Sequence, residues 1–328
     1  MLVRALAACE YELFAVGRRA EGLAMCEEME EARRSSSAQG LLGHHRLAVA
    51  LAEGGRHLEA AEICGREVQD ERSAGPRRDS FWTVVPWAAE LDAAGRHDAA
   101  LEVFAELVDT TRGELDASAT SLAILTWSLV HQSRMLDTAG RCAEAREARK
   151  EALVLLTELG ETGERKTWSN TLSWWTTLFA LSGRSAEPAG TPTEPAPSFG
   201  SAFHHWSPDV KEAYLDGLAT LEQETTALTA AARTDPHGHL AELAAVHRRL
   251  TIRSACCRAE RGHRIPTELR PVFDEGVALA RRLADLAAPG RGREALAGAL
   301  TDRSMYLVAA QQYGEAYEDF VQVVALLD

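Results

Sequence analysis

The stretch "LAEGGRHLEAAEICGREV", from Leu51 to Val68, recurs in near-copies along the chain of 328 residues. It has the pattern of a helix end, a tight turn at Gly55 and the start of a second helix. Each copy carries a large apolar residue four places before its turn, and these residues are Leu13, Leu51, Leu91, Leu136, Phe179 and Leu307. The five turn glycines are 38 to 45 residues apart, and a regular period of this size is typical of a helical solenoid.

The turn position holds glycine in every copy but the last, and its occupants are Gly17, Gly55, Gly95, Gly140, Gly183 and Gln311. Glycine has no Cβ, so it readily adopts the positive φ that ends a helix and reverses the chain. Glu59, Glu144 and Glu315 follow their turns, where the positive end of the next helix dipole favours a carboxylate. Each copy therefore predicts two antiparallel helices joined by a short turn.

All copies except the first, which has Glu10, also share a small residue seven places before the turn, at Ala48, Ala88, Ser133, Thr176 and Ser304. A small residue, a large apolar residue, glycine and then alanine at these offsets resemble the tetratricopeptide repeat. The resemblance covers most of residues 1–180 and about the last thirty residues. It implies an all-α fold, a right-handed superhelical solenoid of antiparallel helix hairpins whose concave groove binds peptides. The period exceeds the family's usual length of about 34 residues, so we expect longer helices, as in the helical arrays of bacterial regulators.

The copy that begins at Phe179 breaks where the others start their second helix. Proline inside a helix costs about 3 kcal/mol, and four prolines follow this copy at Pro188, Pro192, Pro195 and Pro197. We therefore predict N-terminal repeats over residues 1–184, a proline-rich linker over 185–206 and C-terminal helical hairpins over 207–328.

Local signals set further helix limits. Ser207 is a good N-cap and Pro208 suits a first helical turn. The helices that follow are predicted over residues 239–261, 271–287 and 294–310. The stretch "FWTVVPWA" from Phe81 is predicted to be helical from its register with the other repeats, with Pro86 kinking the helix or delaying its start.

Composition limits the class of protein. The formal net charge of −14 disfavours a nucleic-acid binder, which needs a basic face against phosphates. No apolar run approaches the roughly 18 residues of a membrane span, and Glu10 and Glu12 interrupt the apolar stretch that a signal peptide would need. The six cysteines lack the spacing of a disulfide framework. We therefore expect a cytoplasmic protein with no membrane segment.

Both ends of the chain have apolar helix patterns, where solenoid ends normally carry polar caps. Met1 begins within a first-helix pattern, and Leu327 and Asp328 close an apolar one. The ends are expected to pair with another copy, giving a homo-oligomer, or to continue in a longer protein.

Histidines are the first candidates for chemistry, and they stand at His44, His45, His204, His205, His237 and His239. Neither a His-Glu-x-x-His nor a Cys-x-x-Cys pattern accompanies them. We therefore expect no catalytic residue, no metal and no cofactor, and a protein that is not an enzyme. An enzyme or metalloprotein that uses the histidines of the middle segment is the alternative.

Two tryptophans, Trp82 and Trp127, stand thirteen residues before their turns. The resemblance implies that this position faces the concave groove, where an indole offers a large apolar surface to a partner. Asn170 is the equivalent in the repeat after that of Trp127, and Arg134 and Asp137 follow Trp127 on the same face. His45 lies in the repeat before that of Trp82. The alternative is that the tryptophans pack between adjacent repeats.

These patterns favour a protein–protein or protein–peptide interaction scaffold that holds a partner segment in its groove. A peptide-sensing or ligand-sensing module of a larger bacterial regulator is the main alternative. The expected partner is a protein or a peptide, and neither a nucleic acid nor a membrane.

Overall fold

The computed structural model describes residues 13, 18–34, 47–48, 51–52, 55–73, 81–113, 119–161, 208–258, 269–286 and 289–327. These residues contain eleven helices and no strand, which confirms the all-α prediction. The helices are α2 (Arg19–Arg34), α4 (His57–Ser73), α5 (Phe81–Ala93), α6 (His97–Gly113), α7 (Ala119–Thr138), α8 (Cys142–Glu161), α10 (Pro208–Thr234), α11 (Pro236–Arg258), α12 (Arg270–Leu286), α13 (Pro289–Ala309) and α14 (Tyr313–Leu327).

The predicted turns join these helices into antiparallel hairpins. Gly95 has a φ of 74° between α5 and α6. Its amide donates to the carbonyl of Asp92 at 2.9 Å, and the amide of Arg96 donates to the carbonyl of Leu91 at 2.8 Å. This pair of bonds is the Schellman motif, which satisfies the last carbonyls of a helix. The same two bonds and a positive φ recur at Gly55, Gly140 and Gln311.

At two hairpins, an arginine that the sequence analysis did not single out forms an ion pair in the first turn of the second helix. Arg56 donates through Nε and Nη2 to Glu59 at 2.7 and 2.6 Å. Arg141 forms the same fork with Glu144 at 2.7 and 2.6 Å. Such exposed pairs contribute little to the stability of a fold because water screens them, so they fix the first turn locally rather than hold the array together.

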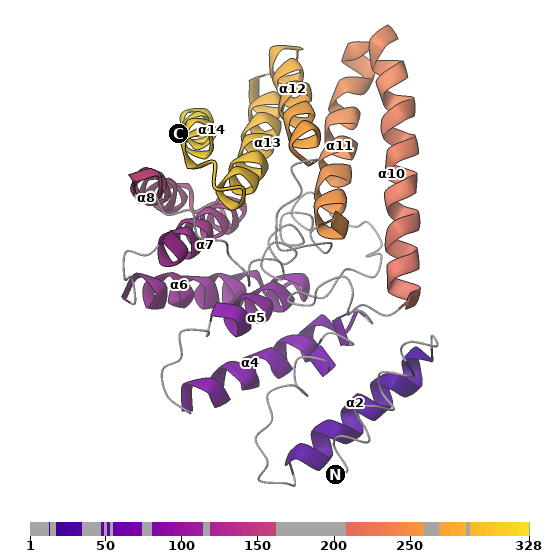
Figure 1. Ribbon diagram of the computed structural model, residues 1–328, viewed down its shortest axis with the longest axis vertical. Coiled ribbons are helices and arrows are strands. Elements are labelled where there is room, and N and C mark those ends of the chain that lie inside the picture. The colour runs from indigo at the N-terminus through magenta and orange to yellow at the C-terminus, as the bar shows by residue number, and fades with distance from the viewer. Residues whose placement is uncertain are drawn as a thin grey trace.

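The described helices form two stacks that meet at α8 and α14. Helices α4 to α8 pack against one another in chain order, and so do α10 to α14. Helix α14 also packs against α8, so α10 lies at the far end of its stack rather than beside α8. Figure 1 shows the resulting open arc, with α10 at one end, α8 and α14 adjacent in the middle, and α4 and α2 at the other end.

One hydrophobic core runs through both stacks. Leu156 and Leu159 of α8, Phe320 and Val323 of α14 and Tyr306 of α13 belong to one cluster of buried residues. The apolar pattern at the C-terminal helix is therefore covered in part within the chain. The predicted linker, residues 185–206, lies outside the described residues, so the domain limits stay a prediction.

Helix limits agree with the sequence at α5, α10 and α12 and differ at two starts. Helix α5 runs through Pro86, and α10 begins at Pro208. Helix α11 begins at Pro236 and α13 at Pro289, three and five residues before the predicted starts, because proline fits the first helical position, where its missing N–H has no partner to lose. A Cβ built on Gly292 would lie 2.4 Å from the Cα of Ala284, so this glycine lets α13 begin directly against α12.

Candidate functional site

Trp127 lies in the core and not on a groove. Its residue exposure is 1%, and its ring centroid is 6.4 Å from that of Phe104 on α6 and 4.4 Å from that of His131 on α7. The prediction that Trp127 faces a partner is therefore wrong, and the packing alternative is right for this residue. The reason is that α7 lies between α6 and α8, and residues 122–131 of α7 are buried apart from the half-buried Ile124.

Arg134 and Asp137 reach different partners. The Nη2 of Arg134 donates to Oδ1 of Asp302 on α13 at 3.3 Å. Asp137 accepts from Nη1 of Arg149 on α8 at 2.6 Å. The described structure therefore does not join these two side chains into one surface with Trp127.

The structure does not describe the side chains of the other three predicted groove residues. Trp82 belongs to α5, and its side chain lies outside the described residues. Asn170 and His45 also lie outside them. A partner role for these three residues stays a prediction.

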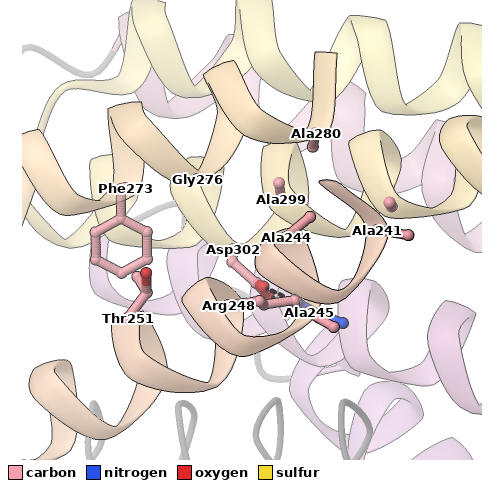
Figure 2. A pocket seen from close by; sticks show the side chains of 11 residues that line it. Ala241, Ala244, Ala245, Arg248, Thr251, Phe273, Gly276, Ala280, Ala299 and Asp302 are labelled. Atoms are coloured by element: carbon pink, nitrogen blue, oxygen red, sulfur yellow. Dashed lines mark hydrogen bonds and ion pairs between the residues drawn. The ribbon is translucent and has the colours of Figure 1, made fainter. Parts of the chain in front are cut away.

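A pocket of about 170 Å³ opens between α11, α12 and α13. Figure 2 shows the three helices around it, with Phe273 at one side and Ala241 at the other. The residues that line it are Ala241, Ala244, Ala245, Arg248, Thr251, Phe273, Gly276, Ala280, Ala295, Ala299 and Asp302. Their spacing of three or four residues along each helix places them on one face of that helix. Most of these side chains are no larger than a methyl group, so they leave space unfilled between helices, whereas protein interiors are normally densely packed.

An ion pair forms the polar wall of this pocket. Arg248 donates through Nε to Oδ2 of Asp302 at 2.6 Å and through Nη2 to Oδ1 at 3.3 Å. The Asp302 side chain is 4% exposed and that of Arg248 is 24% exposed, so the aspartate is the buried anchor and the arginine is the part that meets solvent. Figure 2 shows the two side chains meeting between Ala244 and Ala245.

Arg134 is the second arginine on the same carboxylate, and it comes from the N-terminal stack. Burial lowers the pKa of Arg134, the charge of Asp302 counteracts this, and the charge of Arg248 adds to the lowering. Burial also lowers the pKa of Arg248, but the charge and hydrogen bonds of Asp302 outweigh it, so that pKa lies above its ordinary value. Arg248 is therefore a permanent cation at the pocket.

A buried histidine supports the opposite wall. His247 lies behind Gly276, where an added Cβ would be 3.4 Å from its Nδ1. Its Nε2 is 3.5 Å from Oε2 of Glu275, and the Oγ1 of Thr251 donates to its carbonyl at 2.8 Å. Burial lowers the pKa of His247, and Glu275 offsets only part of that effect, so the ring is neutral near pH 7.

The described residues show neither a metal cluster nor a membrane helix. No group of three or more His, Cys, Asp or Glu side chains in them could hold a metal ion. His237 and His239 lie in the first turn of α11, and His44, His45, His204 and His205 lie outside the described part. Among the helices that the structure describes, none is long and apolar enough to cross a membrane.

Sequence reasoning missed this pocket. Its signal is an alanine and glycine pattern at helical spacing on three consecutive helices, which is also the pattern of ordinary close helix packing. The pairing of Arg248 with Asp302 spans 54 residues and leaves no local trace in the sequence. Arg134 is the one predicted groove residue that the described structure places beside the pocket.

No protein-family model matches the sequence. Comparison with curated proteins gives no match either. Among solved structures the chain is similar to the apo form of the quorum sensor NprR from B. thuringiensis, with 13% sequence identity and a TM-score of 0.34, over 95% of this chain and 72% of that chain. A likeness of this degree carries no inference about ligand or activity. The class of protein is defined by the described helices themselves, as an all-α array of stacked helix hairpins.

Proposed function

We propose that the protein is a binding module for a peptide, or for a peptide-like segment of a partner protein, and not an enzyme. The segment inserts a side chain into the pocket between α11, α12 and α13. The observation that carries the proposal is an alanine-lined pocket of about 170 Å³ with an anchored arginine in its wall.

The size of the pocket favours one side chain over a whole cofactor. Sites for small molecules and cofactors usually measure about 300–1,000 Å³, and this pocket of about 170 Å³ is smaller. Burying a side chain of the size of Leu, Ile or Phe contributes about 1.5–3 kcal/mol. A peptide gains the rest of its affinity along the neighbouring helix surfaces, as in other groove-binding modes.

The polar groups of the pocket favour recognition over catalysis. Arg248 and Asp302 hold each other in a forked ion pair, and an arginine fixed in this way is suited to hydrogen-bond a ligand. The third polar side chain of the lining, Thr251, donates its hydroxyl proton to the backbone of its own helix. The net charge of −14 supports a peptide or protein partner over a nucleic acid.

The test is a screen of an arrayed library of synthetic hexapeptides, labelled with fluorescein at the N-terminus, by fluorescence polarisation. Ala245 lines the pocket and is exposed, so Ala245→Trp fills the mouth without disturbing the core. The expected result is a set of peptides that bind the wild-type chain and bind Ala245→Trp at least about tenfold more weakly, a loss of about 1.4 kcal/mol.

The matched control is Ala227→Trp, which adds the same indole at an exposed position of α10 outside the pocket lining. It should leave every dissociation constant unchanged. The proposal fails if no hexapeptide binds, or if the selected peptides bind Ala245→Trp as tightly as the wild-type chain.

A further inference from the structure

Arg248 lines the pocket between α11, α12 and α13. Its guanidinium carries five N–H donors, and its hydrogen bonds to Asp302 use one donor on Nε and one on Nη2. Within the part of the chain that the structure describes, Nη1 donates to no acceptor, and the side chain keeps 24% of its surface exposed. Asp302 therefore fixes one edge of the guanidinium and leaves the other edge for a ligand.

The packing around Arg248 holds this edge in place. A Cβ built on Gly298 of α13 would lie 3.4 Å from Cζ and 3.5 Å from Nη1 of Arg248, so the guanidinium lies close over the backbone of α13. Asp302 is one turn further along the same helix. An arginine that is oriented before binding loses less rotamer freedom when a ligand arrives.

We infer that Arg248 binds the C-terminal carboxylate of the peptide, while the last side chain of that peptide fills the alanine-lined pocket. This inference rests on the proposed function and names the chemical feature that the site recognises. A carboxylate matches the planar edge of a guanidinium with two parallel hydrogen bonds. The apolar lining lowers the local dielectric and strengthens such a charge-assisted contact.

A C-terminus fits the site better than an internal acidic side chain. In the last residue of a peptide the carboxylate and the side chain branch from the same Cα, so one residue reaches Arg248 and the pocket together. An internal Asp or Glu carries its carboxylate at the tip of the side chain and would bring no apolar group to Ala244, Ala280 or Ala299. The pocket holds about one side chain, so a single residue has to supply both features.

The test compares each selected hexapeptide as the free acid and as the C-terminal amide, on the wild-type chain. The amide removes the charge and keeps the shape, so it should bind about tenfold more weakly or worse, the usual scale for losing a charged hydrogen bond. A third form ends in an aspartate amide, which returns a carboxylate on a side chain. We expect this form to stay weak.

Variants assign the effect to one residue. In Arg248→Gln the acid and the amide should bind about equally, because no cation is left to distinguish them. Arg249→Gln is the matched control, since Arg249 is the next residue of α11, lies within 4.0 Å of Glu224 and does not line the pocket. It should keep the full preference for the acid. Circular dichroism and urea unfolding establish that each variant is folded.

The outcomes separate this inference from the proposed function. If the amides bind as well as the acids while Ala245→Trp still weakens both, the carboxylate assignment is overturned and peptide binding stands. If the aspartate amides recover the affinity of the acids, the site reads an acidic side chain and the C-terminal assignment is overturned. If no hexapeptide binds in any form, the proposed function fails and the assignment fails with it. The comparison of acid and amide peptides on the wild-type chain tests the carboxylate assignment even if Arg248→Gln does not fold.

Discussion

Arg134 of α7 donates a hydrogen bond of 3.3 Å to Asp302 of α13, 168 residues further along the chain. Asp302 also accepts from Arg248 of α11, so one carboxylate links the N-terminal stack to two helices of the C-terminal stack. Its side chain is only 4% exposed, and a buried charge is stabilised by its donors rather than by water. Asp302 is therefore part of both the pocket wall and the contact between the two stacks.

Replacing Asp302 with alanine should be strongly destabilising. The substitution leaves two arginines close together without the carboxylate they share, and breaking a buried ion pair costs about 3–5 kcal/mol. Urea unfolding measures the change in the free energy of unfolding. Arg134→Ala should cost less, because Arg248 still satisfies Asp302. An Asp302→Ala variant within about 1 kcal/mol of the wild-type chain would contradict the role of this residue.

Trp127→Ala should lower the free energy of unfolding rather than weaken the binding of a partner. Removing a large buried aromatic side chain costs about 3–5 kcal/mol of folding free energy, and Trp127 is 1% exposed. Thermal and urea denaturation report the loss. The control is Val154→Ala on α8, where the residue is 57% exposed and the expected change is within about 0.5 kcal/mol. Near-wild-type stability of Trp127→Ala would show that the indole is not core packing.

Replacing glycine with alanine should change the free energy of unfolding in opposite directions at a turn and in a helix. Gly140 has a φ of 72°, so Gly140→Ala should cost about 1 kcal/mol through backbone strain. Gly160 lies in the last turn of α8 without a positive φ, so Gly160→Ala should instead stabilise by up to about 0.5–1 kcal/mol, since alanine is the better helix former. Neither added Cβ would meet an atom within 4 Å, so sterics do not separate the two.

The same reasoning applies in reverse at the last turn. Gln311 has a φ of 58°, which costs a residue with a Cβ about 1–2 kcal/mol. Gln311→Gly should therefore raise the free energy of unfolding by about 1 kcal/mol, less whatever the glutamine side chain contributes. A loss of stability on Gln311→Gly would mean that this side chain outweighs the backbone strain.

Stability should fall as the pH drops below the ordinary pKa of histidine. Burial lowers the pKa of His131 well below its ordinary value, and the charge of Arg134 adds to this. Burial likewise lowers the pKa of His247. Below about pH 6.5 the unfolded chain binds protons that the folded chain refuses, so the free energy of unfolding decreases by up to about 1.4 kcal/mol per pH unit for each histidine.

Urea unfolding between pH 7 and pH 5 measures this slope, above the range where most carboxylates take up protons. His131→Phe keeps an aromatic ring beside Trp127, whose centroid is 4.4 Å from that of the histidine, and removes the titrating group. The variant should show a shallower slope over the same range. An unchanged slope would mean that His131 accepts a proton in the folded protein.

The turns and most helix limits could be predicted from the sequence because they depend on local conformation. Gly95 and Gly140 end helices by their own φ, and Pro208 begins one by its own geometry. The contact between α8 and α14 could not be predicted, since the repeat pattern states which face of a helix is apolar but not which helix covers it.

The burial of Trp127 could not be predicted from the sequence for the same reason. Its distance from the turn gives its position on α7, but the neighbours of α7 on both sides decide whether that position is open or buried. The ion pair between Arg248 and Asp302 joins α11 to α13, and the acidic and basic residues of this sequence offer many other pairings. The site therefore emerged only from the packing of the helices.

Photo-crosslinking tests the central claim most directly. A selected hexapeptide would carry a benzophenone on its last side chain and a free C-terminal carboxylate, and the crosslinked chain would be digested and mapped by mass spectrometry. The account predicts adducts on α11, α12 and α13 around Ala244, Gly276 and Ala299, and their loss in Ala245→Trp. Adducts on α4 to α8, unaffected by Ala245→Trp, would contradict it and place the partner on the N-terminal stack.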